Sequence, residues 1–226
     1  MSGGGLGVAP VVSSAAYAHF LPALATTKID NLRVDVARSR EEIQAARGLV
    51  HRRYRWRGYA VDEPTHGLPA AHEEAAPREV TIVAAAGDGM IGTCTLGFDG
   101  PRGLHADMSY GDVIDEARKA GGRVGEITRL AIDSTDSKAV LASLFNLAFV
   151  AGKAIEDVTD VFIEVNPRHV LFYTRMLGFT VAGGERTCER VGAPSVLLHV
   201  QMDALGGRLE ALSQRLVAES RYEQAA

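Results

Sequence analysis

The chain has 226 residues, of which 46% are hydrophobic, 23% charged and 6% aromatic, with a formal net charge of −4. This apolar content excludes a wholly disordered chain, which could not bury enough apolar surface to offset its conformational entropy. Two cysteines are too few for a disulfide scaffold, and the acidic balance does not favour a nucleic-acid partner. We therefore expect one soluble globular domain, whose function must be inferred from local motifs.

The N-terminal residues 1–30 are rich in Gly, Ala and Ser and have no regular hydrophobic period, which predicts a flexible or loosely docked tail. We do not expect them to form a signal peptide, because no Lys or Arg precedes the apolar stretch. The longest apolar run, 139–154, contains polar residues and is shorter than the roughly 20 residues that a bilayer requires. We expect a cytoplasmic protein.

Hydrophobic periodicity and turn residues divide the rest of the chain into strands and helices. Ser39 and Glu42 form a capping box, which predicts the start of the first helix. Gly87-Asp88-Gly89 suits a tight hairpin turn. The predicted elements are a strand at 32–37, a helix at 39–58, a loop at 59–77, strands at 80–86 and 90–98, a helix at 110–120, a strand at 124–132, a helix at 137–156, a strand at 161–165, a helix at 168–177, strands at 179–181, 185–191 and 195–202, and a helix at 204–222.

This order predicts an α+β fold with a mixed sheet. The step from strand 124–132 through a helix to strand 161–165 should be a right-handed crossover, which makes these strands parallel neighbours. The connecting helix is apolar on nearly all sides, so we expect it to be buried. We predict a single domain at 31–203, preceded by the tail and followed by a C-terminal helix and tail at 204–226.

The most informative segment joins strand 161–165 to the next helix. Asn166 ends the strand, Tyr173 follows seven residues later, and Gly178-Phe179 returns the chain to the sheet. Phe179 is expected to pack in the core, and Gly178 directly follows a helix, where glycine is favoured. Neither residue needs a chemical role. The phenol of Tyr173 is either a half-buried group without a chemical role or a proton donor to a departing thiolate.

A second segment, Gly125–Asp133, places charged residues in a central strand. Strict alternation puts Glu126, Thr128 and Leu130 on one face, with Ile127, Arg129 and Ala131 on the other. Burying a carboxylate and a guanidinium in such a strand costs free energy unless the two groups form an ion pair or serve a function. They are either a structural ion pair at the sheet rim or a base and an orienting group in a cleft.

The spacing from Asn166 to Phe179 resembles the last strand–helix motif of the GNAT acyltransferase superfamily. The resemblance implies a GNAT-like, mostly antiparallel sheet flanked by helices, with strand 124–132 beside the acyl donor and a bulge exposing a backbone N–H as an oxyanion donor. Acetyl-CoA enzymes of this fold carry a glycine-rich pyrophosphate loop after that strand. Here residues 133–138 contain two aspartates and no glycine. An acyl carrier protein thioester would not need such a loop.

Glu126-x-x-Arg129 and Arg53-Tyr54-Arg55, with Trp56 and Asp62-Glu63, look like the acyl-homoserine-lactone synthases and the related N-acyl amino acid synthases. The Asn166–His169 run resembles the second group more closely, and the resemblance spans residues 32–202. It implies transfer of a fatty acyl group from an acyl carrier protein thioester to the amine of an amino acid, by direct attack. No permanently bound cofactor is expected; acyl-CoA is the alternative donor.

The resemblance also implies roles for individual residues. Glu126 would accept or orient amine protons, Arg129 would hold the acceptor carboxylate or support the site, and Tyr173 would protonate the thiolate. Trp56 and Asp62 would belong to the acceptor pocket. The residues expected at the acyl donor or substrate are Leu130, Ala131, Ile132, Asn166, Arg168, His169, Phe172, Phe145 and Phe149.

Residues 51–57 form the one dense basic and aromatic cluster. It is either a solvated helix end or a docking surface for an acidic carrier protein through Arg52, Arg53, Arg55 and Arg57. The histidines and glutamates at 66–74 fit no metal-ligand spacing, so we expect no metal. The two cysteines, Cys94 and Cys188, suit a reduced core.

Other functions stay open. A lactone synthase would take S-adenosylmethionine as acceptor, an acetyltransferase would use acetyl-CoA, and a non-catalytic module would bind acyl ligands without turnover. The leucines between Leu205 and Leu216 form a stripe on the last helix. This stripe packs on its own domain, forms a homodimer contact or docks on a membrane surface.

Overall fold

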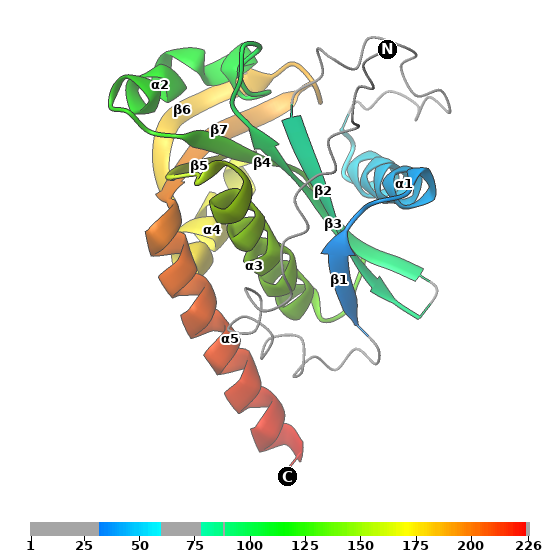
Figure 1. Cartoon of the computed structure of the whole chain (residues 1–226). Coiled ribbons are helices and arrows are strands. Elements are labelled where there is room, and N and C mark those ends of the chain that lie inside the picture. The colour runs from blue at the N-terminus through cyan, green and yellow to red at the C-terminus, as the bar shows by residue number, and fades with distance from the viewer. Residues whose placement is uncertain (1–31, 60–77, 88, 225–226) are drawn as a thin grey trace, which may run out of the picture.

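The computed structural model describes residues 32–59, 78–87 and 89–224, with side chains up to residue 219 (Figure 1). Seven strands form one sheet in the order β1-β2-β3-β4-β5-β7-β6. Neighbouring strands are antiparallel except β4 and β5, which are parallel. The elements are β1 (Arg33–Val36), α1 (Arg40–Trp56), β2 (Arg78–Ala86), β3 (Gly89–Phe98), α2 (Asp107–Lys119), β4 (Val124–Ile132), α3 (Ser137–Glu156), β5 (Asp160–Val165), η4 (Pro167–His169), α4 (Val170–Leu177), β6 (Thr180–Cys188), β7 (Ala193–Gln201) and α5 (Met202–Gln224).

The predicted α+β fold with a mostly antiparallel sheet and a parallel β4–β5 pair is confirmed. The capping box of α1 is present, since Ser39 Oγ accepts from the Glu42 N–H and the Glu42 carboxylate accepts from the Ser39 N–H, both at 3.1 Å. The bounds predicted for β4 and α3 match those observed. The N-terminal tail and the loop at 60–77 lie outside the described residues.

Two predictions about strands and helices were wrong in detail. The separate strands at 179–181 and 185–191 are one strand, β6, which stays paired with β7 through two register shifts. One shift lies at Gly183, where an added Cβ would stand 2.6 Å from the Tyr110 ring, so the residue must be small. Helix α2 begins at Asp107, earlier than residue 110, and it has a kink at Tyr110, whose φ and ψ angles of −138° and 23° are not helical.

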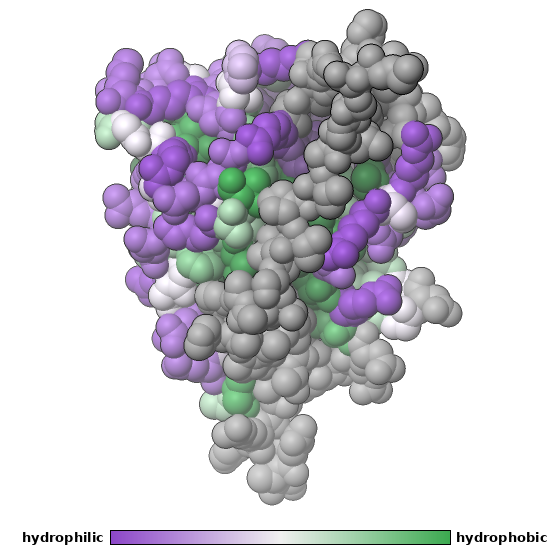
Figure 2. Space-filling view, viewed as in Figure 1, coloured by the Kyte–Doolittle hydropathy of each residue, from purple (hydrophilic) through white to green (hydrophobic). Residues whose placement is uncertain are grey.

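The two faces of the sheet have separate hydrophobic clusters. The larger cluster joins residues of α3, α4 and α5 to one face of the sheet, and a smaller cluster around Tyr110, Phe162 and Leu197 lies under α2. Helix α1 packs on β2, β3 and β4. Apolar residues show chiefly near the middle of the face seen in Figure 2, around α3, whereas hydrophilic residues cover α2.

Helix α3 is long and apolar enough to cross a membrane, but two-thirds of its apolar window is buried inside the domain (67%). It packs between β3 and α5, so core packing accounts for its composition. The stripe on α5 has the same explanation, because Leu205, Leu209 and Leu212 belong to the core. Each fully buried leucine contributes roughly 1.5–3 kcal/mol.

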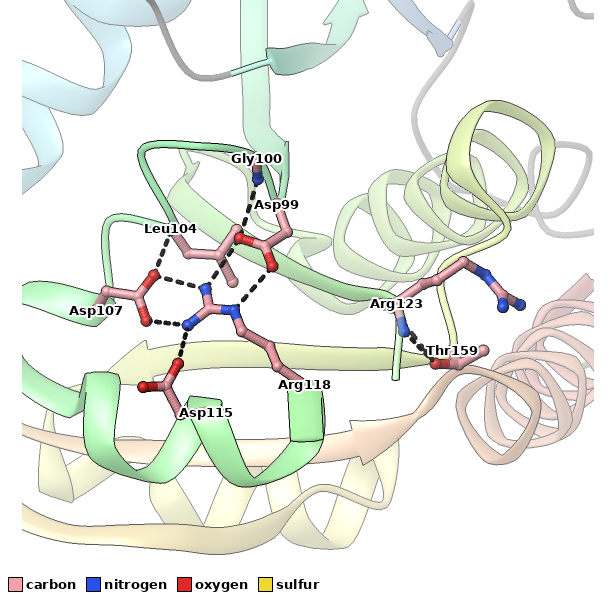
Figure 3. A network of polar contacts seen from close by, with 8 residues as sticks. All are labelled: Asp99, Gly100, Leu104, Asp107, Asp115, Arg118, Arg123 and Thr159. Carbon is pink, nitrogen blue, oxygen red and sulfur yellow. Dashed lines mark hydrogen bonds and ion pairs between the residues drawn. The ribbon is translucent and has the colours of Figure 1, made fainter. Parts of the chain in front are cut away.

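A polar network fixes the loop that connects β3 to α2 (Figure 3). The Arg118 guanidinium donates to Asp99 at 2.8 and 2.9 Å, to Asp107 at 2.7 and 2.8 Å, and to Asp115 at 2.7 Å. Asp107 also accepts from the Leu104 N–H at 2.6 Å. These carboxylates raise the pKa of Arg118, so its charge is permanent. The network therefore sets the position of residues 99–107, which reach the cleft described below.

We predict that Arg118→Gln lowers the free energy of unfolding by about 1–2 kcal/mol, because three carboxylates lose their shared cation in a partly solvated network. Urea denaturation followed by circular dichroism measures this change. The matched control is Lys119→Gln, which removes one exposed ion pair with Glu116 and should leave stability unchanged within error. Equal losses in both variants would contradict a structural role for the network.

Candidate active site

A cleft of about 1060 Å³ opens where β4 and β5 separate. The two strands pair only between residues 124–126 and 160–162, and the backbones diverge beyond that point. The walls come from α1, β4, β5, the η4–α4 segment, the β6–β7 turn and the first turns of α3. This size suits a small-molecule substrate site.

A β-bulge shapes one wall of the cleft. Thr93 and Thr95 of β3 face Ala131 and Thr128 of β4, so β4 carries one extra residue. Arg129 has a φ angle of 50°, which is uncommon for a residue other than glycine. The bulge is the feature that the superfamily resemblance predicted for this strand.

The bulge also reverses the side-chain alternation. Leu130 packs against the same cluster as Ile127, on the α3 face, while the Arg129 side chain reaches Glu79 on the other face. The predictions that Leu130 shares a face with Glu126, and Arg129 a face with Ile127, were therefore wrong, because strict alternation does not allow for an inserted residue.

The cleft has one apolar and one polar side. Ile127, Ile163 and Val165 line it and belong to the cluster on the α3 face. Glu164 lies between Ile163 and Val165 in β5, so its side chain faces the opposite side of the sheet. Leu130, Ala131 and Ile132 also line the cleft, where β4 has no strand partner on its β5 side. A backbone N–H of this segment as an oxyanion donor stays a prediction.

Arg129 forms an ion pair with Glu79 of β2, at 2.7 Å. His105 Nε2 lies 2.7 Å from the other Glu79 oxygen and 3.3 Å from Arg129 Nη2. Burial opposes ionisation of Glu79, but the hydrogen bonds from His105 and Arg129 outweigh it and hold the pKa below its usual value. The structural partner of Arg129 is thus Glu79, which sequence spacing alone did not identify, and not Glu126.

Glu126 lies behind the cleft wall and is 2% exposed. Its carboxylate accepts from the backbone N–H groups of His105 at 2.7 Å and Ala106 at 3.0 Å. Burial raises the pKa of Glu126, and these hydrogen bonds offset the effect only in part. The carboxylate anchors the loop before α2; its role in handling amine protons stays a prediction and would require an intervening water.

Tyr173 lines the cleft from α4, on the apolar side. Its ring makes edge contacts with Phe172 and Phe179, with centroids 5.3 and 6.1 Å apart. Burial raises the pKa of Tyr173, so the phenol keeps its proton at neutral pH. Within the described residues its hydroxyl has no hydrogen-bond partner. A buried, protonated phenol in a cleft is suited to donate a proton to a leaving group.

The residues around Asn166 shape the same wall. Asn166 Oδ1 accepts from the Arg168 N–H at 3.3 Å, and Asn166 Nδ2 donates to the Pro194 carbonyl at 3.3 Å, so this side chain fixes the turn after β5. Arg168 bonds the Tyr59 hydroxyl at 2.9 Å. His169 lines the cleft, and burial together with Arg168 and Arg57 lowers its pKa, which keeps the ring neutral at pH 7.

The aromatic residues expected along the acyl group have different positions. Phe172 lines the cleft. Phe145 is fully buried in the core, and Phe149 lies at the α3–α5 contact, where a Cβ on Gly206 would stand 2.9 Å from its ring. Helix α3 contributes Leu141 and Ser137 to the cleft instead. Contact of Phe145 and Phe149 with the acyl chain stays a prediction.

The basic cluster of α1 lies at the edge of the cleft. Arg53 and Arg57 line the cleft, and their guanidinium groups lie 4.8 and 4.7 Å from the ring centroid of Trp56. Trp56 is 67% exposed and does not line the cleft, while Arg52 and Arg55 are exposed. Asp62, and the acidic and histidine residues up to position 74, lie outside the described residues.

Sequence reasoning missed Glu164 and Arg190, which both line the cleft. The Glu164 side chain is 5% exposed and accepts from Ser195 Oγ at 2.7 Å and from Arg190 Nη2 at 3.1 Å. A carboxylate in a central strand was the signal that singled out Glu126, and it applies equally to Glu164. Arg190 lies in the turn between β6 and β7, and only the folded chain brings it to β5.

The two cysteines are free and buried, as predicted. Burial raises the pKa of Cys94 to about 12 and also raises that of Cys188, which lines the cleft. A thiol that keeps its proton is a weak nucleophile, so neither cysteine is suited to form an acyl-enzyme, and direct transfer stays a prediction. Among the described residues no group of three or more His, Cys, Asp or Glu side chains is placed to hold a metal.

The sheet, the splayed β4–β5 pair and the bulged β4 define an acyltransferase of the GNAT fold. A family model described as N-acyl amino acid synthase FeeM matches residues 45–201, more than half of the chain. The chain belongs to this family and is an acyltransferase. The resemblance to N-acyl amino acid synthases is thereby confirmed.

Solved structures agree with this assignment. The chain is similar to FeeM, an N-acyl amino acid synthase from uncultured soil microbes, with 26% identity, a TM-score of 0.68, and coverage of 79% of this chain and 94% of that one. It shares its fold with the AHL synthase LasI, with 12% identity, a TM-score of 0.56, and coverage of 79% and 96%. Mutant forms of the spermidine/spermine N-acetyltransferase SpeG from Vibrio cholerae give 12% identity, a TM-score of 0.50, and coverage of 78% and 97%. No curated protein matches the chain.

We predict that Glu126→Gln lowers the free energy of unfolding by about 1–3 kcal/mol, because the amide has one acceptor oxygen for two backbone N–H groups. The protein should stay folded at 25 °C and turn over more slowly. Thermal denaturation and initial rates measure the two effects. Glu185→Gln, an exposed change on β6, is the matched control. Full activity in a destabilised Glu126→Gln variant would contradict the catalytic role predicted for this carboxylate.

Proposed function

We propose that this acyltransferase moves a fatty acyl group from an acyl carrier protein thioester to the amine of an amino acid, in the cytoplasm. The family supports the N-acyl amino acid product. The observation that carries the choice of donor is the N-terminus of α3, which is closed by an acidic side chain.

In a CoA-dependent GNAT enzyme, this helix N-terminus and the loop before it bind the pyrophosphate through backbone N–H groups. Here Asp136 is the N-cap of α3 and its carboxylate accepts from the Ala139 N–H at 3.4 Å. Asp133 stands three residues earlier. Asp133 is paired with Arg53 at 3.2 Å, whereas Asp136 has no ion pair among the described residues, so its negative charge repels a pyrophosphate at this point. A carrier protein presents its thioester on phosphopantetheine, which has no pyrophosphate.

The basic cluster of α1 supports the same donor. Arg53 and Arg57 line the cleft, while Arg52 and Arg55 are exposed on the same helix. Acyl carrier proteins are acidic, so an arginine surface at the cleft edge would attract and orient one. The net charge of the whole chain is −4, so the overall charge would not attract an acidic protein. The attraction would come from this local positive surface.

The proposed reaction is a direct aminolysis of the thioester. The neutral amine attacks the carbonyl carbon, a C–N bond forms, and the oxyanion accepts a hydrogen bond from a backbone N–H near Leu130–Ile132. The C–S bond then breaks and Tyr173 gives its proton to the sulfur. The proton lost by the amine passes through water, assisted by Glu126, and Tyr173 is reprotonated from solvent. The products are an amide and the free carrier thiol.

We predict that acyl carrier proteins loaded with medium and long acyl chains, mixed with the twenty amino acids, yield N-acyl amino acids in a mass-spectrometric assay. Acyl-CoA of the same chain lengths should react at least 10-fold more slowly, because its pyrophosphate meets the carboxylate of Asp136 at the N-terminus of α3. Acetyl-CoA and S-adenosylmethionine, included in separate reactions, test acetylation and lactone synthesis. Products formed only from acetyl-CoA or only as lactones would overturn the proposal, and acyl binding without any amide would favour a non-catalytic module.

We predict that Tyr173→Phe lowers kcat by about 10²-fold or more, because the thiolate then leaves without a proton donor. KM and the free energy of unfolding should change little, since the hydroxyl has no partner within the described residues. Steady-state kinetics with acyl carrier proteins measures the effect. Phe172→Leu, a change of neighbouring ring packing without loss of a proton donor, is the control; an equal loss of kcat there would show that packing and not proton donation matters.

A further inference from the structure

The cleft has an unequal distribution of charge. Among the described residues that line it there are five arginines and a single carboxylate, on a chain whose overall charge is negative. The arginines are Arg47, Arg53, Arg57, Arg129 and Arg190, and the carboxylate is Glu164. Such a site attracts an anionic substrate group and offers only one place for a cationic one.

Arg190 and Glu164 stand side by side on the polar side of the cleft. Their contact is one hydrogen bond, from Arg190 Nη2 to a Glu164 oxygen at 3.1 Å. Ser195 Oγ holds the other Glu164 oxygen at 2.7 Å. The Arg190 side chain is 30% exposed, and most of its five N–H donors make no hydrogen bond within the described residues. A guanidinium with free donors can bind a carboxylate through two parallel hydrogen bonds.

Arg129, which also lines the cleft, is held by its ion pair with Glu79. Its Nη1 bonds Glu79 at 2.7 Å, and its Nη2 lies 3.3 Å from His105. This fixed arrangement, together with the φ angle of 50°, suits a residue that supports the bulge. Among the described residues Arg190 has a hydrogen bond with Glu164 alone, so it is better placed to receive a substrate carboxylate.

We propose that Arg190 binds the α-carboxylate of the amino acid acceptor while Glu164 binds its ammonium group, which makes this pair the determinant of acceptor class. This inference rests on the proposed function. An α-amino acid carries both charges on one carbon, so it is complementary to a guanidinium and a carboxylate that are adjacent. The Thr128 hydroxyl, which is buried at the cleft without a hydrogen-bond partner in the described structure, offers the ammonium group a further acceptor.

The test measures binding of reaction products, so it does not depend on turnover. N-Dodecanoyl derivatives of leucine, phenylalanine and glutamine, each as the free acid and as the carboxamide, are titrated into the full chain by calorimetry. Wild-type protein should bind the acids at least 10-fold more tightly than the carboxamides. Arg190→Gln should bind both forms alike, and Arg190→Lys should keep part of the preference because it retains the charge without the planar fork.

Two other variants serve as controls. Arg129→Gln should keep the preference for the acid, and so should Arg186→Gln, which removes an arginine of β6 that is paired with Asp112 and does not line the cleft. A wild-type protein without the preference, or an Arg190→Gln variant that keeps it, overturns the inference. If wild-type protein binds none of the six compounds, the proposed function itself fails. Melting temperatures of all variants verify that each is folded.

Discussion

The separation of β4 and β5 after three paired residues is the constraint on which the rest of the site depends. Where parallel strands stay paired, their backbone groups are satisfied and the space between them is closed. Here the strands diverge in the middle of the sheet, so backbone groups, side chains of both faces and the turn after β5 all reach one cleft. The bulge at Arg129 adds to this effect, because it turns an arginine to the polar face and leucine and isoleucine side chains to the apolar face.

The two faces of the sheet give the cleft its chemical division. On the α3 face, Ile127, Ile163 and Tyr173 belong to the main hydrophobic cluster, which suits a fatty acyl chain and a protonated phenol. On the other face, buried carboxylates are kept ionised or anchored by specific partners. Glu126 holds the loop at His105, and Arg118 fixes the same loop from α2. The loop therefore links the stability of α2 to the position of His105 and, through Glu79, of Arg129.

Local sequence was sufficient to predict most elements and the fold class, because these depend on periodicity and capping: the Ser39–Glu42 box, the β2–β3 hairpin and the apolar α3 were all found. Tyr173 and the β4 segment were identified through their spacing and a family resemblance. The bulge at Arg129 could not be located from alternation, since one inserted residue reverses every later side chain. Glu79 and Arg190 were missed because their roles depend on strand register and on a turn, which bring together residues 50 and 26 positions apart in the chain.

The negative net charge and the arginine-rich cleft have one explanation when they are considered together. Under the proposed function, the arginines that line the cleft lie where anions would enter: a carrier protein at the edge of the cleft and a substrate carboxylate inside it. The proposed donor would also account for Asp136, rather than glycine, at the N-terminus of α3. If the cleft were positive at every point, a nucleotide pyrophosphate would compete with the carrier-bound donor. Asp136 at the start of α3 would disfavour that competitor, so in the proposed reaction one negative charge selects the donor while the arginines attract the acceptor.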